Sequence, residues 1–245
     1  MNELFDDLYE VAEQCLSPIA KDKANRERSW DECYTFFQQY RTLNREQRNN
    51  QRELACLHLG FFLASWGMFR GSGSLIHKDY TIYGDLIDIL LRQEYEALWL
   101  PDFFKDLLKN ENHVLEDNEK VILIFKLKEQ VQDYINGLRI IKNHKLPEEN
   151  ARATDTIITK ILMGTLCCTP AYDQYFPVGL TVCGINRCGS FTIRSFVNLL
   201  NICRENKLWT QLKQRPIERH KVVYPVMRVV DLYFWTKGFN AMNNN

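Results

Sequence analysis

The 245-residue sequence lacks any long hydrophobic run. Its most apolar stretch, His58–Phe69, is too short for a bilayer, which needs about 20 apolar residues to span it. The first residues, MNELFDDLYE, are acidic and amphipathic and do not resemble a secretory signal peptide. The sequence therefore predicts a soluble, cytoplasmic protein with no membrane partner.

Motifs for metal binding are also missing. The five histidines form no H-x-x-x-H or H-E-x-x-H pattern, and Cys183 and Cys188 lack a second ligand pair at zinc-like spacing. The eight cysteines lie mostly in apparent helices, and buried free thiols are the default in a cytosolic chain. We expect no metal, no other cofactor and no disulfide framework.

The chain has no net charge, with 31 Lys/Arg against 31 Asp/Glu, which argues against general polyanion binding. Residues 1–136 nevertheless carry a net charge of −8 and residues 137–245 a net charge of +8. This asymmetry suggests a face for nucleic acid, or for an acidic partner, on the C-terminal half. The alternative is that the two halves neutralise each other across an internal interface.

Two groups of basic residues would form such a face. The first consists of Arg139, Lys142, Lys145, Arg152 and Lys160, and the second of Arg204, Lys207, Lys213, Arg215, Arg219 and Lys221. Such side chains contact phosphates and set register without reading sequence. We predict DNA contacts at Lys142, Lys145, Arg152 and Lys160.

Helical periodicity dominates the chain, and we find no internal repeat, low-complexity run or Gly/Ser linker. We predict an all-α fold, either one compact multi-helix domain or two lobes, an acidic one over residues 1–141 and a basic one over 142–245. The expected helices are Glu3–Leu16, Ser29–Leu43, Arg45–Phe69, Ile82–Arg92, Glu94–Lys109, Asp117–Ile140, Ala151–Leu166, Ser190–Asn206 and Tyr224–Phe239. Thr81 and Ser190 are expected to cap helices, and Val178–Cys183 alternates like a short strand.

The segment Ala151–Phe176 is the most informative part of the basic half. Its apolar residues recur at helical spacing, so one face of the helix is predicted to be buried. Pro170 then stops this helix or starts the next one. Asp173 follows between Tyr172 and Tyr175, at a junction between packed helices instead of on a solvated face.

This order resembles the helix-hairpin-helix DNA glycosylases of the endonuclease III type, over about 30 of the 245 residues. In that family a K-T-A-x-x-V/I-L helix precedes a small-residue and proline break and then the catalytic aspartate. Here Thr159–Gly164 match the helix and Pro170–Asp173 match the break and the aspartate. The glycine-rich hairpin is missing, Leu146–Arg152 stand in its place, and the four-cysteine iron–sulfur motif is absent. Asp155 occupies the position of the lysine that serves bifunctional members, so the resemblance implies a monofunctional glycosylase.

Such an enzyme needs few groups. Cleavage of an N-glycosidic bond builds positive charge on the sugar, which a carboxylate stabilises while it orients water. The base first leaves the stack, and aromatic side chains hold it in a pocket. We predict Asp173 as the catalytic residue and Tyr172 and Tyr175 as substrate-binding residues. The alternative places Asp173 at a helix N-terminus and the tyrosines in the core.

Two further regions carry candidate residues. Trp66 and Arg70 share a helix face before a Gly/Ser loop, and we predict both as substrate-binding, with a phosphate held by the loop. The alternative is a helix C-cap built on glycine. In the last helix, Asp231 lies among apolar residues, so it is expected to pair with an arginine or to be a second acid candidate.

The predicted function is base excision from DNA by a monofunctional glycosylase, as in DNA repair. One alternative is a non-enzymatic DNA- or protein-binding helical module, such as a defence-system component. Another is an all-helical enzyme for a phosphorylated or nucleotide ligand, which would use Arg70 and the Gly/Ser loop.

Overall fold

The computed structural model describes residues 4–22, 24–69, 78–109, 115, 117–138, 153–219 and 222–243, and these form an all-α fold. The helices are α1 (Leu8–Lys21), α2 (Arg28–Tyr40), α3 (Arg45–Asn50), α4 (Arg52–Ser65), α5 (Tyr83–Leu90), α6 (Lys105–Lys109), α7 (Glu119–Gly137), α8 (Asp155–Thr165), α9 (Tyr175–Val182), α10 (Ile193–Glu205), α11 (Leu208–Gln214) and α12 (Val226–Asn243). Two 3₁₀ turns span Tyr80–Ile82 and Gln93–Trp99. Strands β1 (Glu218–Arg219) and β2 (Val222–Val223) pair antiparallel. None of the described helices is long and apolar enough to cross a membrane.

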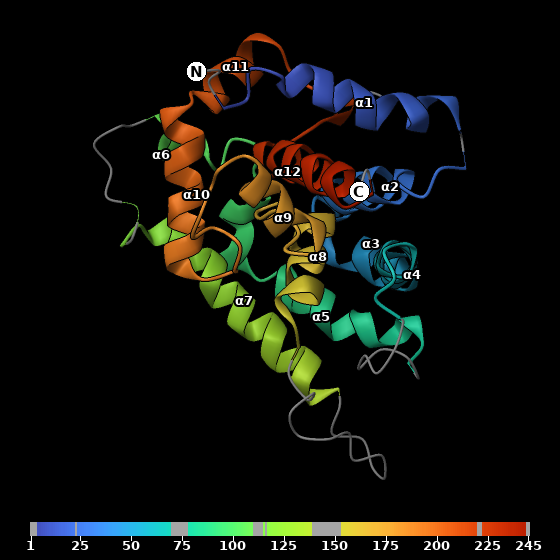
Figure 1. Ribbon diagram of the computed structural model, residues 1–245. Helices are drawn as coiled ribbons and strands as arrows, with labels where there is room; N and C mark the ends of the chain where they lie inside the picture. Colours follow the sequence, from blue (N-terminus) through green and yellow to red (C-terminus); the bar gives the residue numbers. More distant parts are fainter. Residues whose placement is uncertain are drawn as a thin grey trace, which may run out of the picture.

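Helix α8 lies at the centre of the fold (Figure 1). Every residue from Ile157 to Tyr172 is buried, and α8 packs against α2, α4 and α7. The indole of Trp30 on α2 donates a hydrogen bond of 3.0 Å to the carbonyl of Met163. Asp173 is the first partly exposed residue after this buried run. The predicted junction is therefore present, with the aspartate at the point where the chain leaves the core.

Helix α12 packs between α1 and α9 (Figure 1). A Cβ atom at Gly179 of α9 would overlap the carbonyl oxygen of Phe234, and one at Gly238 of α12 would overlap that of Tyr175. Only glycine allows backbones to approach so closely. The two glycines thus hold α9 directly against α12, at Tyr175 and at Gly179.

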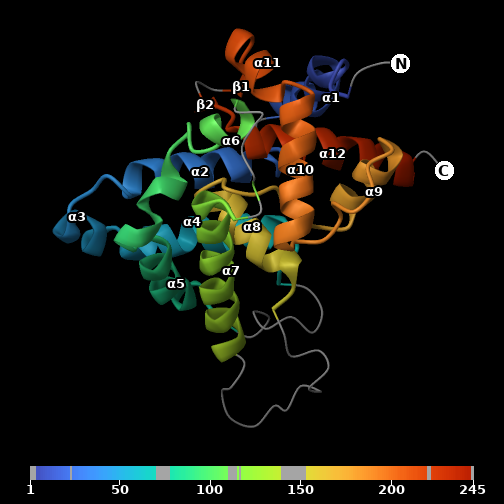
Figure 2. The same cartoon turned by 90° about the vertical axis from the view of Figure 1, so that its left-hand side faces the viewer.

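One continuous hydrophobic core includes residues from both sequence halves, and α7 packs against α10 along one side of the molecule (Figure 2). Ion pairs also join the halves, with the basic partner from residues 137–245: Lys213–Asp102, Arg219–Asp31, Arg228–Glu27 and Lys237–Asp7. Lys213 and Arg219 belong to the second basic group. Internal pairing therefore accounts for part of the charge asymmetry.

The strand expected at Val178–Cys183 is wrong, because these residues belong to α9 and its C-cap. Phe176, Gly179 and Leu180 are buried at helical spacing, so burial follows a period near 3.6 and not 2. The alternation of apolar residues covered too few positions to separate the two periods.

Several helix ends also differ from expectation. The helix expected over Arg45–Phe69 is interrupted at Gln51, and the one over Glu94–Lys109 is replaced by a 3₁₀ turn before Pro101 and the short α6. Asp79 accepts from the Thr81 amide ahead of α5, and Thr192 caps α10 in place of Ser190. Helix α11 and the small sheet were not expected.

Candidate active site

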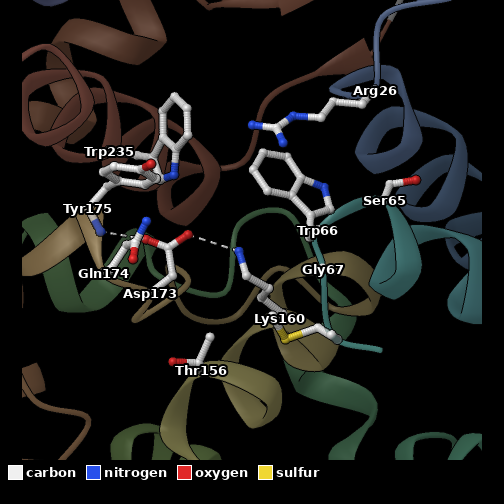
Figure 3. A pocket seen from close by; sticks show the side chains of 11 residues that line it. Arg26, Ser65, Trp66, Gly67, Thr156, Lys160, Asp173, Gln174, Tyr175 and Trp235 are labelled. Atoms are coloured by element: carbon white, nitrogen blue, oxygen red, sulfur yellow. Dashed lines mark hydrogen bonds and ion pairs between the residues drawn. The ribbon is translucent and has the colours of Figure 1, made fainter. Parts of the chain in front are cut away.

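A pocket of about 400 Å³ opens between the loop before α2, the end of α4, the first turns of α8, the start of α9, and α12 (Figure 3). It is lined by Arg26, Ser65, Trp66, Gly67, Met68, Thr156, Lys160, Asp173, Gln174, Tyr175 and Trp235. Four predicted site residues, Asp173, Tyr175, Trp66 and Lys160, meet here from three separate parts of the sequence.

The carboxylate of Asp173 is bound on both of its oxygens. Oδ1 accepts hydrogen bonds from the amides of Tyr175 at 3.0 Å and Phe176 at 3.4 Å, in the first turn of α9. Oδ2 accepts from the ammonium of Lys160 at 3.0 Å. The side chain keeps 11% of its surface exposed. Asp173 thus has the helix-capping position of the alternative interpretation and also faces the pocket.

The segment that carries this aspartate is held by three further hydrogen bonds. The Tyr172 amide donates to Thr159 Oγ1 at 2.9 Å, and Thr156 Oγ1 donates to the Tyr172 carbonyl at 2.9 Å. The Ala171 amide donates to Asp231 Oδ1, also at 2.9 Å. Helices α8 and α12 therefore fix the backbone immediately before the pocket, which preorganises the carboxylate.

Lys160 has an environment different from the one expected of a phosphate contact. Its side chain is only 3% exposed, because α8 is the central helix. Its ammonium pairs with Asp173 and lies 4.6 Å from the ring centroid of Trp66, a cation–π distance. The lysine therefore contributes to the inner wall of the pocket and orients the carboxylate.

Three aromatic rings stand close together in the pocket wall (Figure 3). The Trp66 and Trp235 rings are 6.1 Å apart at 88°, and the Tyr175 and Trp235 rings 5.2 Å apart at 73°. Trp66 follows directly on α4, which ends in a Schellman motif with Gly67 at φ +76 and the Met68 amide bonded to the Leu63 carbonyl. The helix expected to run to Phe69 thus ends at Ser65, with Gly67 in its C-terminal cap. Gly71 and Gly73, for which a C-cap was the alternative, lie outside the described residues.

Other predicted site residues lie elsewhere. Tyr172 is 5% exposed and packs on Phe176 and Phe191, with ring centroids 4.9 and 5.2 Å away, so it belongs to the core behind α9. The predicted contacts Arg70, Lys142, Lys145 and Arg152 lie outside the described residues.

Seven of the eleven lining residues were not predicted as site residues, and Arg26 and Trp235 are the two with the largest side chains among them. Arg26 comes from the acidic half, where a single arginine in a polar loop gives no recognisable pattern. Trp235 lies in the aromatic last helix, which was interpreted as core. Trp235 is not on the helix face formed by Val226, Val229, Val230, Tyr233 and Phe234. Its position on another face was the one sign in the sequence that it has a different role.

Asp231 pairs with an arginine, as expected. Its Oδ2 accepts from Arg228 at 2.7 Å, and both side chains are 4% exposed. Burial raises the pKa of Asp231 to about 6, while Arg228 opposes that rise. Asp231 does not line the pocket, and it accepts the hydrogen bond of the Ala171 amide, two residues before Asp173.

Across the described ranges, no group of three or more His, Cys, Asp or Glu side chains is arranged to hold a metal ion. All eight cysteines are free thiols.

Comparisons of this chain with protein-family models, with curated proteins and with solved structures each found no match. The functional assignment therefore depends on the residues of the pocket and their chemistry.

Proposed function

We propose that this chain is a monofunctional DNA glycosylase, which hydrolyses the N-glycosidic bond of a damaged or modified base. One observation carries the proposal: Asp173, the residue that the glycosylase resemblance selects, faces a pocket walled by Trp66, Tyr175 and Trp235. DNA as partner, a cytoplasmic location and a role in repair or defence are parts of the same proposal.

The pocket supplies what the reaction needs. Its volume of about 400 Å³ lies within the range of small-molecule sites, so it has room for a base turned out of the helix. The aromatic rings offer it apolar contacts. Asp173 lies beside this space with its orientation already fixed, so it stabilises the positive sugar without reorganising.

The chemical step is a hydrolysis. The water oxygen bonds to the sugar carbon, the bond from that carbon to the base nitrogen breaks, and the base leaves with the bonding electron pair and takes up the proton that the water loses. Asp173 stabilises the charge and accepts a hydrogen bond from the water. Lys160 positions the carboxylate and forms no covalent bond with the sugar.

A non-enzymatic DNA- or protein-binding module is the second candidate. The observation that favours it is that every hydrogen bond of the Asp173 carboxylate goes to Lys160 or to the first turn of α9. Capping and ion pairing give this aspartate a structural role without catalysis. In that case the pocket holds a base or a side chain and leaves it unchanged.

A base-release assay separates the two. The single variant Asp173→Asn would leave the buried Lys160 ammonium unpaired, a cost of about 3–5 kcal/mol. The double variant Asp173→Asn/Lys160→Met removes both charges and keeps the fold testable by thermal unfolding.

Wild type and double variant are incubated with DNA duplexes that carry a panel of damaged and modified bases, followed by alkali and a strand-break readout. Breaks with wild type alone support the glycosylase. Duplex binding by both proteins without any break favours the binding module.

A further inference from the structure

Arg26 is an exposed arginine at the mouth of the pocket. Its guanidinium carbon lies 5.3 Å from the ring centroid of Trp66 (Figure 3). The ion pairs and side-chain hydrogen bonds found among the described residues do not include its guanidinium. By contrast, Arg28, two residues later, pairs with Glu32 at 3.8 Å.

Arg26 sets the net charge of the pocket. The other charged groups in the lining are Lys160 and Asp173, which form an ion pair, so their charges cancel. The pocket thus carries one excess positive charge, which attracts an anionic part of a ligand.

The position of Arg26 also fixes the side from which an anion approaches. Arg26 also lines a second groove, whose lining includes the carboxylates of Asp22 and Glu27, the latter paired with Arg228. The Asp22 carboxylate repels an anion on that side, so the anion binds on the pocket side. A guanidinium that rests against an aromatic ring keeps its N–H groups available for a bidentate contact, and this geometry matches two oxygens of a phosphate.

We propose that Arg26 binds a phosphate next to the nucleotide whose base enters the pocket. The proposal rests on the proposed function for the identity of the ligand, a nucleotide. The chemistry of the site is a phosphate attached to a nucleoside, and it has two sources, a DNA strand and a free nucleoside monophosphate.

The test combines a protein variant with a chemical change in the ligand. Binding is measured by fluorescence anisotropy with a labelled duplex that contains one tetrahydrofuran abasic analogue. Two further duplexes replace the phosphate on the 5′ or the 3′ side of the analogue by an uncharged methylphosphonate. The proteins are wild type, Arg26→Gln and the matched control Arg28→Gln, and no base release is needed.

Arg26→Gln is expected to weaken binding of the charged duplex by about tenfold, the size of a lost charge-assisted contact. With one of the two methylphosphonate duplexes it should cause no additional loss, because the partner phosphate is already neutral. Arg28→Gln should bind like wild type. The proposal would be overturned if Arg26→Gln bound the charged duplex as tightly as wild type does. It would also be overturned if the variant lost the same factor in affinity on both methylphosphonate duplexes as on the charged one.

The same experiment separates this proposal from the proposed function. If the protein binds the duplex through Arg26 but releases no base, the phosphate site is supported and the glycosylase function is contradicted. Thermal stabilisation by deoxyadenosine monophosphate but not by deoxyadenosine, lost in Arg26→Gln, assigns the phosphate to a free nucleotide if no duplex binds. A wild type that responds to none of these probes has no phosphate site at Arg26.

Discussion

Two carboxylate–cation pairs lie beside the same short stretch of chain. Asp173 and Lys160 are 3.0 Å apart, and Asp231 and Arg228 are 2.7 Å apart, with Asp231 also bound to the Ala171 amide. The first pair lines a pocket, whereas the second is enclosed between α12 and the core. Burial and ion pairing are thus shared by both pairs. Access to a cavity with aromatic walls is what distinguishes the candidate catalytic aspartate from the structural one.

The largest expected effect comes from breaking the enclosed pair. Arg228→Met leaves the Asp231 carboxylate buried without its closest cation, so we expect a loss of about 3–5 kcal/mol in the free energy of unfolding. The double variant Arg228→Met/Asp231→Asn should regain part of that loss, since Asp231 no longer carries a charge, while Glu27 still loses its ion pair with Arg228. Urea unfolding measures both. A single variant as stable as the double one would show that the pair is not coupled.

The pH dependence of stability should separate the enclosed pair from the rest of the molecule. Burial raises the pKa of Asp231 to about 6, above its ordinary value of 3.8. Asp231 therefore contributes stability that is fully present below pH 3.8 and is lost as the pH rises through 6. At about 1.4 kcal/mol per unit, the loss is about 3 kcal/mol.

Asp231→Asn lacks this titration and still accepts from the Ala171 amide. Urea unfolding of both proteins at several pH values should show the advantage of wild type over Asp231→Asn falling between pH 4 and 6.5. A pH-independent difference would mean that Asp231 does not titrate there.

A glycine substitution tests whether the two regions are mechanically linked through α9 and α12. In Gly238→Ala the new methyl group meets the Tyr175 carbonyl, one turn from the pocket carboxylate. We expect a loss of about 1–3 kcal/mol in unfolding free energy. We also expect the rate of base release to fall by a larger fraction than the unfolding free energy does. Full activity in the folded variant would show that the pocket tolerates movement of α9.

The smallest effects should distinguish the two tyrosines beside Asp173. Tyr175 lines the pocket, so Tyr175→Ala should lower the affinity for an abasic-analogue duplex or the rate of base release by about tenfold. The Tyr172 hydroxyl is buried without a hydrogen bond among the described residues. Tyr172→Phe should therefore change stability by less than about 0.5 kcal/mol and leave base release unchanged. The opposite ranking would mean that the pocket opens on the other side of α9.

The sequence was sufficient for the all-α class, for the buried helix α8 and for the junction at Asp173, because these depend on local periodicity. The role expected of Pro170 is wrong, because α8 already ends at Thr165 and α9 begins only at Tyr175. It did not separate Tyr172 from Tyr175, since the direction of each side chain is set by how α9 rests on α12. The basic character of Lys160 suggested a surface contact, whereas the tertiary packing of α8 buries it. Arg26 and Trp235 reach the pocket only through long-range packing, which has no local pattern in the sequence.

The most direct test is to neutralise each pair in turn and to compare base release under single-turnover conditions. Asp173→Asn/Lys160→Met removes the ion pair in the pocket, and Arg228→Met/Asp231→Asn removes the enclosed pair together with the contact of Arg228 to Glu27. Thermal unfolding tests whether both variants are folded. If Asp173 is catalytic, the first variant should lose at least about 100-fold in rate, and the second should stay within about tenfold of wild type. Equal losses in the two variants, or release retained by the first, would contradict the assignment of Asp173 as the catalytic residue.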